Sequence, residues 1–260
     1  LTGKGLTYGG SLARTEATGY GTVYFTDAML KDRGDSLKGK KCAVSGSGNV
    51  AIYCCEKLIQ LGATPVTVSD SNGTIYDPNG IKVDVLKQVK EVERARLTRY
   101  AELVPTAQYT PVDKYPAGKH QVWTYNVDCA FPCATQNELN EEDAKTLLAN
   151  GCKVVAEGAN MPSTLGAIDQ FLKAKIAYGP AKAANAGGVA TSQLEMEQNA
   201  GMTAWTFEEV DQKLHTIMTN LYKNVADTAR EFGVEGNLVL GANIAGFRKV
   251  ADAMIAQGVI

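Results

Sequence analysis

Short apolar runs alternate with longer segments of mixed polarity along most of the chain. The runs at residues 42–44, 66–68 and 176–178 are too short to form helices, whereas the segments between them repeat apolar residues at helical spacing. Clusters of glycine, asparagine and proline separate the segments and indicate turns. Because alternating strands and helices form a parallel sheet covered on both faces, this pattern predicts an α/β fold with a mostly parallel sheet.

The pattern places five strands and a larger number of helices on the sequence. Strands are predicted at residues 42–44, 66–68, 121–127, 154–157 and 176–178. Helices are predicted at residues 15–33, 52–61, 83–103, 163–174 and 243–256, with others ending at residue 150, opening near residue 189 and following residue 206. In the first helix we expect Thr15 to be the cap, Glu16 to lie in the first turn, and Phe25, Ala28 and Met29 to form the apolar face.

The last part of the chain is predicted to be helical. Thr206 and Glu209 have the spacing of a capping box, in which each side chain accepts a hydrogen bond from the other residue's backbone N–H. The apolar residues that follow recur on one helix face, at Val210, Leu214, Ile217, Leu221 and Val225. The sequence therefore divides into a sheet-containing part at residues 1–205 and a helical C-terminal extension at residues 206–260.

Residues 44–51 read V-S-G-S-G-N-V-A and connect a predicted strand to a predicted helix. The G-x-G-x-x-A spacing is typical of dinucleotide-binding folds: Gly46 permits a tight turn, Gly48 lets a pyrophosphate approach the backbone, and Ala51 allows close helix–strand packing. An ordinary glycine turn can carry the same letters. Here Asp70 ends the next strand, about twenty residues beyond Gly48, where an acidic group would meet the adenine ribose. We therefore predict a Rossmann-like, doubly wound sheet that binds a nicotinamide dinucleotide.

The carboxyl ends of parallel strands share one edge of a sheet, and ligands bind there. The loops expected at that edge carry amides, hydroxyls and glycines suited to a ribose or a carboxamide: Asn49, Thr135, Gln136, Asn160, Asn185, Gly187, Gly188 and Ser192. Asp128 and Glu157 end strands, and each either accepts hydrogen bonds from the backbone or serves as an acid–base catalyst. His215 fits a packed or surface position on a helix, and His120 lies in a loop without a recognisable partner.

Composition excludes several classes of protein. Lys+Arg is 26 and Asp+Glu is 28, so no excess of positive charge indicates a nucleic-acid or membrane surface. No apolar run approaches the roughly 18 residues of a membrane span. The six cysteines form no C-x-x-C pair and have no histidine near them in the sequence, so we expect no metal site. We interpret them as the reduced thiols of a cytoplasmic protein.

Further motifs resemble those of the hexameric glutamate dehydrogenases of the NADP type. The G-x-G-x-x-A motif at 46–51, called the fingerprint below, is one of them. The others are A-R-T-E-A-T-G-Y-G at 13–21, P-C-A-T-Q-N-E at 132–138, A-E-G-A-N-M-P at 156–162, N-A-G-G-V at 185–189 and G-A-N-I-A-G-F at 241–247. The resemblance covers essentially the whole chain. It implies the coenzyme-binding domain of a two-domain subunit, in which a cleft closes between this domain and a separate substrate domain.

The resemblance also implies roles for individual residues. Thr18 and Asn185 would hold the nicotinamide carboxamide, and Asn160 its ribose. The full set of expected coenzyme-binding residues is Thr18, Gly46, Ser47, Gly48, Asn49, Val50, Ser69, Asp70, Ser71, Lys90, Ala134, Thr135, Asn160 and Asn185. For the substrate, Val189 would pack on the carbon chain, Ser192 would bond the distal carboxylate, and Arg14 would lie at the junction of coenzyme and substrate.

The choice between NADP and NAD depends on the end of the second strand. Asp70 favours NAD, because its charge repels a 2′-phosphate and its oxygens accept from a 2′-hydroxyl. The neighbouring Ser69 and Ser71 are small donors able to face a phosphate. The next helix adds basic residues, which also fit a solvated face, at Lys90, Arg94 and Arg96. The serine-rich stretches resemble the NADP-linked branch of the family, so we predict NADP, with NAD as the alternative.

The resemblance implies an enzyme that interconverts L-glutamate with 2-oxoglutarate and ammonia, with hydride transfer to NAD(P), as a homo-hexamer. The family's catalytic lysine lies in a Lys-Gly-Gly motif, which is absent from this sequence. We therefore expect no catalytic residue here and expect this chain alone to be inactive. Two alternatives stay open: a related NAD-dependent dehydrogenase for amino acids with apolar side chains, which Ser192 disfavours, and a stand-alone nucleotide-binding module without catalysis.

Overall fold

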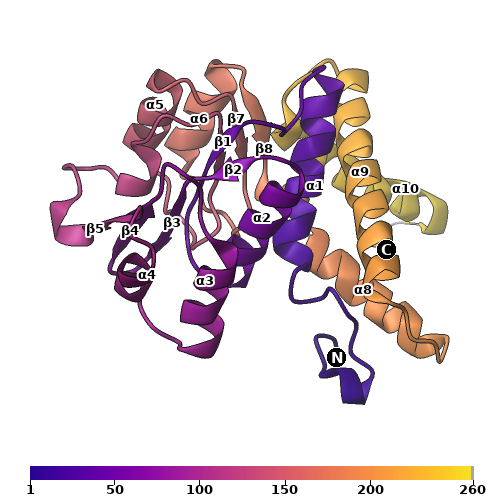
Figure 1. Ribbon diagram of the computed structural model, residues 1–260. Coiled ribbons are helices and arrows are strands. Elements are labelled where there is room, and N and C mark those ends of the chain that lie inside the picture. The colour runs from indigo at the N-terminus through magenta and orange to yellow at the C-terminus, as the bar shows by residue number, and fades with distance from the viewer. Residues whose placement is uncertain (259–260) are drawn as a thin grey trace.

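A parallel five-stranded sheet lies at the centre of the computed structural model, which describes residues 1–258 (Figure 1). Its strands are β1 (Lys41–Val44), β2 (Thr64–Pro65), β6 (Cys129–Phe131), β7 (Val154–Ala156) and β8 (Ala177–Gly179). Their order is β2-β1-β6-β7-β8, and every pair is parallel. From β1 the chain first moves outward to β2 and later returns to β6 on the other side of β1, which confirms the doubly wound α/β fold.

Helices cover both faces of this sheet. Successive strand residues point to opposite faces, so Cys42 and Val44 pack in one core and Ala43 in another. The first core lies under α1 (Ala17–Asp32), α2 (Asn49–Gln60) and α9 (Phe207–Glu231). The second lies under α5 (Glu141–Ala149) and α6 (Leu165–Lys173). Figure 1 shows α5 and α6 on one side of the sheet and α1 and α9 on the other.

A second, antiparallel sheet was not predicted. It consists of β3 (Thr67–Asp70), β4 (Gly73–Tyr76) and β5 (Gln108–Pro111). The predicted strand at 66–68 is therefore wrong in its placement, because the chain pairs with β1 only over Thr64–Pro65 and then leaves the parallel sheet. The Thr67 side chain lies at the departure: its hydroxyl accepts from Val44 N at 2.9 Å and donates to Val44 O at 3.0 Å, so the backbone of Val44 bonds a side chain there instead of a strand.

The strand predicted at residues 121–127 is also wrong. That segment forms a 3-10 turn, η4 (Gln121–Trp123), and the strand begins later, at Cys129. Two other 3-10 turns are η1 (Leu6–Tyr8) and η3 (Val112–Lys114). The apolar residues of 121–127 are buried, but they pack in the core under α5 and α6 instead of pairing in the sheet. Burial alone therefore produced the strand-like pattern.

Helix α1 differs from its prediction at its start and in its burial. It begins at Ala17, after Glu16 at the N-cap, and neither Glu16 nor Thr15 provides a side-chain cap. Almost every residue from Ala17 to Leu30 is buried, so the helix has no single apolar face. The reason is close packing: a Cβ at Gly19 would lie 2.5 Å from Cys54 N in α2, and one at Gly21 would lie 2.7 Å from Gly187 Cα.

The segment predicted as one helix at 83–103 is broken into three pieces. These are α3 (Val83–Lys87), the π-helical turn η2 (Gln88–Val92) and α4 (Leu97–Leu103). After β8 the chain forms α7 (Ala181–Ala184) and α8 (Gly187–Ala200). The predicted helix near residue 189 is thus confirmed, and it begins two glycines earlier.

The capping box at the start of α9 is confirmed, since the side chains of Thr206 and Glu209 each bond the other residue's backbone N–H. The buried stripe of α9 is shifted slightly from the prediction and consists of Val210, Leu214, Met218, Tyr222 and Val225. The last helix, α10 (Leu238–Gln257), begins five residues before the predicted start, with Asn237 as its cap. Residues 259–260 of the predicted extension lie outside the described residues. No helix among residues 1–258 combines the length and apolar character needed to cross a membrane.

Candidate dinucleotide groove

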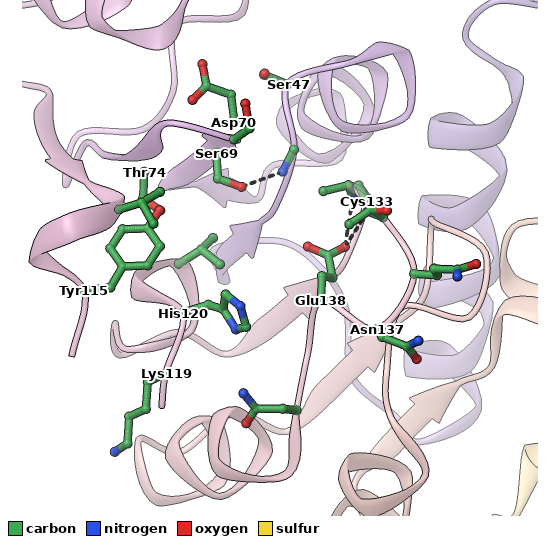
Figure 2. A pocket seen from close by; sticks show the side chains of 18 of the residues that line it. Ser47, Ser69, Asp70, Thr74, Tyr115, Lys119, His120, Cys133, Asn137 and Glu138 are labelled. Atoms are coloured by element: carbon green, nitrogen blue, oxygen red, sulfur yellow. Dashed lines mark hydrogen bonds between the residues drawn. The ribbon is translucent and has the colours of Figure 1, made fainter. Parts of the chain in front are cut away.

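The turn between β1 and α2 forms one wall of a hollow of about 1210 Å³ (Figure 2). Gly46 has a φ of +84°, a left-handed conformation that favours glycine, and its N–H donates to Ser69 Oγ at 2.8 Å. A Cβ at Gly46 would lie 3.0 Å from both Ala134 Cα and Cys133 O. Gly46 is therefore required by the protein's own packing, because the loop after β6 presses against the turn.

Gly48 differs from Gly46, because the surrounding protein does not exclude a side chain there. Its backbone is extended, with a φ of −89°, and a Cβ there would meet no atom of the described protein within 4 Å. The space in front of Gly48 is part of the hollow. Gly48 is also the N-cap of α2, and no side chain caps that helix. The first-turn N–H groups of α2 and its dipole are thus directed at open space, which suits an anionic group such as a phosphate.

The loop after β6 faces this helix terminus and is held by Glu138. One carboxylate oxygen of Glu138 accepts from Ala134 N at 2.9 Å and from Thr135 N at 3.3 Å. Burial raises the pKa of Glu138, although these hydrogen bonds act in the opposite direction. At the base of the loop, Cys133 N donates to Ser45 Oγ at 2.9 Å. The P-C-A-T segment is therefore fixed against β1, with Ala134 and Thr135 exposed to the hollow.

Asp70 lies at the hollow, and its carboxylate already accepts three backbone hydrogen bonds. One of its oxygens accepts from Asn72 N at 2.8 Å and Gly73 N at 3.1 Å, and the other accepts from Leu97 N at 3.0 Å. This last bond holds the start of α4 against β3. It also brings Arg96, the residue before α4, to Ser71, whose hydroxyl accepts from Arg96 Nη1 at 2.9 Å.

The structure does not place Lys90 in the hollow. Its ammonium donates to Ala95 O at 2.9 Å within its own segment, and it is not among the residues that line the hollow. The reason is the π-helical turn at 88–92, which breaks the predicted continuous helix. Of the basic residues predicted near the second strand, Arg96 is the one bonded to a residue of the hollow.

A second hollow of about 910 Å³ continues from the first. The two share the residues Val50, Cys133, Ala134, Thr135 and Gln136, so together they form one groove. The second hollow contains all the remaining predicted site residues: Arg14, Thr18, Asn160, Asn185, Val189 and Ser192. Asn185 Nδ2 donates to Asn160 Oδ1 at 2.8 Å and to Ala159 O at 3.2 Å.

Helix α8 forms the far wall of the second hollow. A Cβ at Gly188 would lie 2.5 Å from Thr18 Oγ1, so the glycine is needed for α1 and α8 to approach each other. Val189 is 71% exposed and presents an apolar side chain to the hollow. Ser192 follows about one turn later, and its hydroxyl accepts from Arg14 Nε at 2.9 Å. Ser192, predicted to bond the distal carboxylate, and Arg14, predicted at the junction of coenzyme and substrate, are thus direct neighbours.

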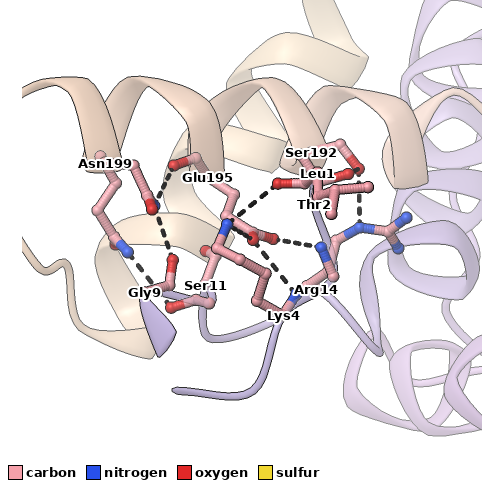
Figure 3. A network of polar contacts seen from close by, with 12 residues as sticks. Leu1, Thr2, Lys4, Gly9, Ser11, Arg14, Ser192, Glu195 and Asn199 are labelled. Atoms are coloured by element: carbon pink, nitrogen blue, oxygen red, sulfur yellow. Dashed lines mark hydrogen bonds and ion pairs between the residues drawn. The ribbon is translucent and has the colours of Figure 1, made fainter. Parts of the chain in front are cut away.

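The N-terminal segment is attached to α8 beside these two residues (Figure 3). Glu195, which is fully buried, accepts from Gly3 N at 2.7 Å and pairs with the Lys4 ammonium. Thr2 Oγ1 contacts Ser192 Oγ at 3.2 Å. Burial raises the pKa of Glu195, but the hydrogen bonds from Lys4 and Gly3 outweigh it, so the net pKa lies below the ordinary 4.5.

The other residues singled out in the sequence form hydrogen bonds or pack within the protein itself. Glu157 accepts from Ala181 N at 2.7 Å and Ser163 N at 3.3 Å, and Asp128 accepts from Lys41 N at 2.8 Å, as the hydrogen-bonding alternative requires. The His215 ring packs edge-on against Tyr24. All six cysteines are unpaired and buried. Within the described residues no cluster of three or more His, Cys, Asp or Glu side chains is arranged to hold a metal ion.

Comparison with known proteins assigns the chain to a family. A sequence model of the Glutamate/Leucine/Phenylalanine/Valine dehydrogenase family matches residues 9–258. The chain belongs to this family. The resemblance found in the motifs is thereby confirmed, and the match extends over nearly the whole chain.

Individual relatives agree with this assignment. The NADP-specific glutamate dehydrogenase of Helicobacter pylori is 65% identical over 259 residues, and the NAD(P)-specific glutamate dehydrogenase of Xylanibacter ruminicola is 56% identical over 262. The crystal structure of Plasmodium falciparum glutamate dehydrogenase is 46% identical and superposes with a TM-score of 0.95. Each alignment covers the whole of this dehydrogenase-family chain but only 58%, 57% and 55% of the relative, respectively. The chain therefore spans somewhat more than half the length of these relatives.

Proposed function

We propose that this chain is the coenzyme-binding part of an NADP-dependent glutamate dehydrogenase, which interconverts L-glutamate with 2-oxoglutarate and ammonia. The observation that carries the proposal is the uncapped N-terminus of α2 behind Gly48, at the point where the strand order of the sheet reverses. Residues 1–205 would form the dinucleotide-binding unit, and the helices after residue 206 an extension. A bound nicotinamide supplies the hydride chemistry, and the protein binds and orients it.

The groove offers suitable partners for each part of a dinucleotide. The backbone at Gly46–Val50 provides N–H groups for the pyrophosphate, and the open space at Gly48 leaves room for it. In the second hollow, the Thr18 hydroxyl and the Asn160 and Asn185 amides suit the hydrogen-bonding groups of a carboxamide and a ribose. The residues that line the second hollow include no His, Asp or Glu to act as a base for the hydroxyls of Thr18 and Ser192, which fits binding and orientation instead of covalent catalysis.

Glutamate would bind at the end of the second hollow. Val189 offers an apolar surface for the carbon chain, and Arg14 and Ser192 offer donors for a carboxylate. A hydroxyl and a guanidinium favour an acidic side chain over an apolar one, which disfavours the related dehydrogenases for apolar amino acids. No residue of this chain is proposed as the catalytic acid or base, so the chain alone would bind coenzyme without turnover.

NADP is favoured over NAD by the engagement of Asp70. Three backbone N–H groups already hold its carboxylate, which leaves it less available to a ribose 2′-hydroxyl. Ser71 and Arg96 lie beside it and together provide a hydroxyl and a guanidinium for a phosphate. The Helicobacter pylori relative is named as NADP-specific, whereas the Xylanibacter ruminicola relative is named for both coenzymes, so NAD stays the alternative.

The assembly and the compartment are proposed on other grounds. The motifs resemble those of hexameric enzymes, so we infer a homo-hexamer for the complete protein. Unpaired thiols favour a reducing compartment, so we infer the cytoplasm. The stand-alone nucleotide-binding module remains the second candidate, because the groove by itself requires only nucleotide binding. The mass of the native polypeptide distinguishes these two.

The test of the proposal is a matched pair of glycine substitutions. Gly48→Val places a side chain in open space at the α2 N-terminus, on an extended backbone that valine readily adopts. Gly246→Ala is the control, since a Cβ there also meets nothing, but the residue lies in α10, away from the groove. We expect Gly48→Val to weaken NADPH binding by about tenfold or more in a fluorescence titration, because the side chain occupies the space that a phosphate needs to reach the α2 N–H groups, and each phosphate hydrogen bond lost in this way costs about 1–3 kcal/mol. Equal affinities in both variants would refute a pyrophosphate site at Gly48.

A further inference from the structure

His120 lies on the floor of the first hollow and is held there by a buried carboxylate. Its backbone N–H donates to Asp143 Oδ1 at 2.8 Å, and its ring Nδ1 lies 2.7 Å from Asp143 Oδ2. The Asp143 side chain is fully buried, whereas that of His120 is 45% exposed. Figure 2 shows the imidazole between Tyr115 and Glu138, pointing into the space in front of the fingerprint turn. The two bonds to one carboxylate fix both the position and the orientation of the ring.

This arrangement determines the chemistry of the other ring nitrogen. Asp143 accepts from Asn140 N at 3.1 Å as part of the α5 capping box, and an ionised carboxylate only accepts, so Nδ1 carries a proton toward it. The other nitrogen, Nε2, has no hydrogen-bond partner among the described residues. In the neutral ring Nε2 is an acceptor, and in the charged ring it is an N–H donor. A held imidazole with a free nitrogen in a ligand groove has the geometry of a binding group.

The charges around His120 are mixed. Asp143 and Glu142 lie on α5, Glu138 lies on the loop after β6, and Lys119 is the neighbouring residue in its own segment. Tyr115 also lines the hollow, and its hydroxyl is engaged with Thr74 Oγ1 at 2.6 Å. The hydrogen bond to Asp143 raises the pKa of His120, burial opposes that change, and Glu138 adds to it. The charged ring is therefore favoured at a higher pH than for a free histidine.

We propose that His120 is a coenzyme-binding residue that contacts the adenosine end of the dinucleotide, and that its protonation strengthens coenzyme binding. The proposal rests on the proposed function of the groove. If the α2 N-terminus binds the pyrophosphate and the Asp70–Ser71 turn faces the adenine ribose, His120 lies with Tyr115 and Val122 in the part of the lining that is left for the adenosine. A donor from a cationic ring matches the anionic phosphates of the ligand and the acceptor nitrogens of a purine.

The sign of the pH dependence follows from this charge match. A ligand with negative phosphates favours the imidazolium, so the pKa of His120 is higher in the complex than in the free protein. Affinity is then greatest below the pKa of the free protein and falls as the pH rises through the pKa of the complex. A pKa increase of one unit on binding corresponds to about a tenfold fall in affinity across that range.

The test uses the fact that the chain has two histidines. NMR of ¹⁵N-labelled imidazoles follows both rings from about pH 5.5 to about 8.5, the range that brackets histidine titration. His215→Asn assigns the signals, since that ring packs against Tyr24 on the outer helices. With saturating NADH we expect the His120 signals to shift and their titration midpoint to rise, while the His215 signals stay unchanged. NADH is the probe of choice because it has no 2′-phosphate that titrates in this range.

Binding titrations of the variants complete the test. His120→Asn retains an amide that can donate to Asp143 but no titrating ring, and in this variant the fall in NADH affinity between low and high pH should disappear. In His215→Asn the fall should persist. Saturable binding with unchanged His120 signals would overturn the inference and leave the proposed function intact. Failure of the unmodified chain to bind either NADH or NADPH would overturn both. The imidazole measurement does not depend on folding of the His120 variant.

Discussion

The two fingerprint glycines serve different purposes that the motif alone does not distinguish. A side chain at Gly46 would collide with Cys133 and Ala134 of the protein itself, whereas one at Gly48 would project into the open groove. The first glycine is thus needed for folding of the turn, and we propose that the second is needed for the approach of a ligand. Substitutions at Gly48 should consequently affect binding with little effect on stability, and those at Gly46 should affect both.

The engagement of Asp70 and the position of Arg96 lead to a prediction about coenzyme choice. Arg96→Ala should lower NADPH affinity by roughly tenfold and leave NADH affinity unchanged, because a charged hydrogen bond contributes about 1.5–3 kcal/mol and the exposure of Arg96 reduces that value. Lys90→Ala is the control, since its ammonium is bonded to Ala95 O. Parallel fluorescence titrations with both coenzymes measure the ratio. Equal losses for NADPH and NADH in Arg96→Ala, or a larger change in Lys90→Ala, would remove Arg96 from the phosphate site.

Single residues also mark the limit of prediction from the sequence. The fingerprint was recognisable because its residues are adjacent and its context is local. His120 was not recognisable as a site residue, since its partner Asp143 lies 23 residues along the chain and only folding brings them together. Glu138 was quoted within a motif, but nothing in the sequence indicated that it holds the backbone of Ala134 and Thr135. Lys90 was misplaced because the π-helical turn at 88–92 gives no clear sequence signal.

At the scale of elements, local patterns predicted the helices and strands whose capping residues or apolar spacing can be read within the segment itself. The capping box of α9 and the strands β1, β7 and β8 were found in this way. Helix α1 was misjudged because it is buried by α2, α8 and α9 together, and small residues at its contacts replace a visible apolar stripe. β3 was misjudged because its place outside the parallel sheet depends on tertiary contacts, among them the bonds of the Thr67 hydroxyl to the Val44 backbone.

The attachment of the N-terminal segment to α8 predicts a dependence on pH. Since the pKa of Glu195 is lowered in the folded protein, its ionised form stabilises the attachment above the ordinary pKa of 4.5, and that stabilisation is lost as the pH falls through the lower, folded value. The protection of the amides of residues 2–10, measured as their exchange rates relative to those of an unstructured chain at the same pH, should therefore fall on acidification. Glu195→Gln should show fast exchange already at neutral pH.

The control for this prediction is Glu197→Gln, an exposed carboxylate on the same helix. It should exchange like the unmodified chain at neutral pH. Fast exchange in both variants, or in neither, would contradict a specific role of Glu195 in holding the segment. The comparison matters for function because the same segment contacts Ser192 at the end of the groove.

At the scale of the whole molecule, the sheet order locates the groove. β1 lies between β2 and β6, and the loops after β1 and β6 both line the hollow into which the α2 N-terminus points. This location was predictable, because alternating strands and helices imply a parallel sheet with ligands at its carboxyl edge. The connection between the two hollows at Val50 and the 133–136 loop could not be predicted, since it depends on the packing of α1, α8 and the loop after β6.

The central claim is that this chain binds a nicotinamide coenzyme and lacks the groups that complete the reaction. The most direct test is one preparation of the 260-residue chain, titrated with NADPH by fluorescence and then assayed for glutamate-dependent turnover. We predict saturable binding without turnover, because positioned acid–base groups typically contribute about 10²–10⁴-fold to the rate and we propose no residue of this chain as the catalytic acid or base. Absence of NADPH binding, or glutamate-dependent turnover by the chain alone, would contradict the account.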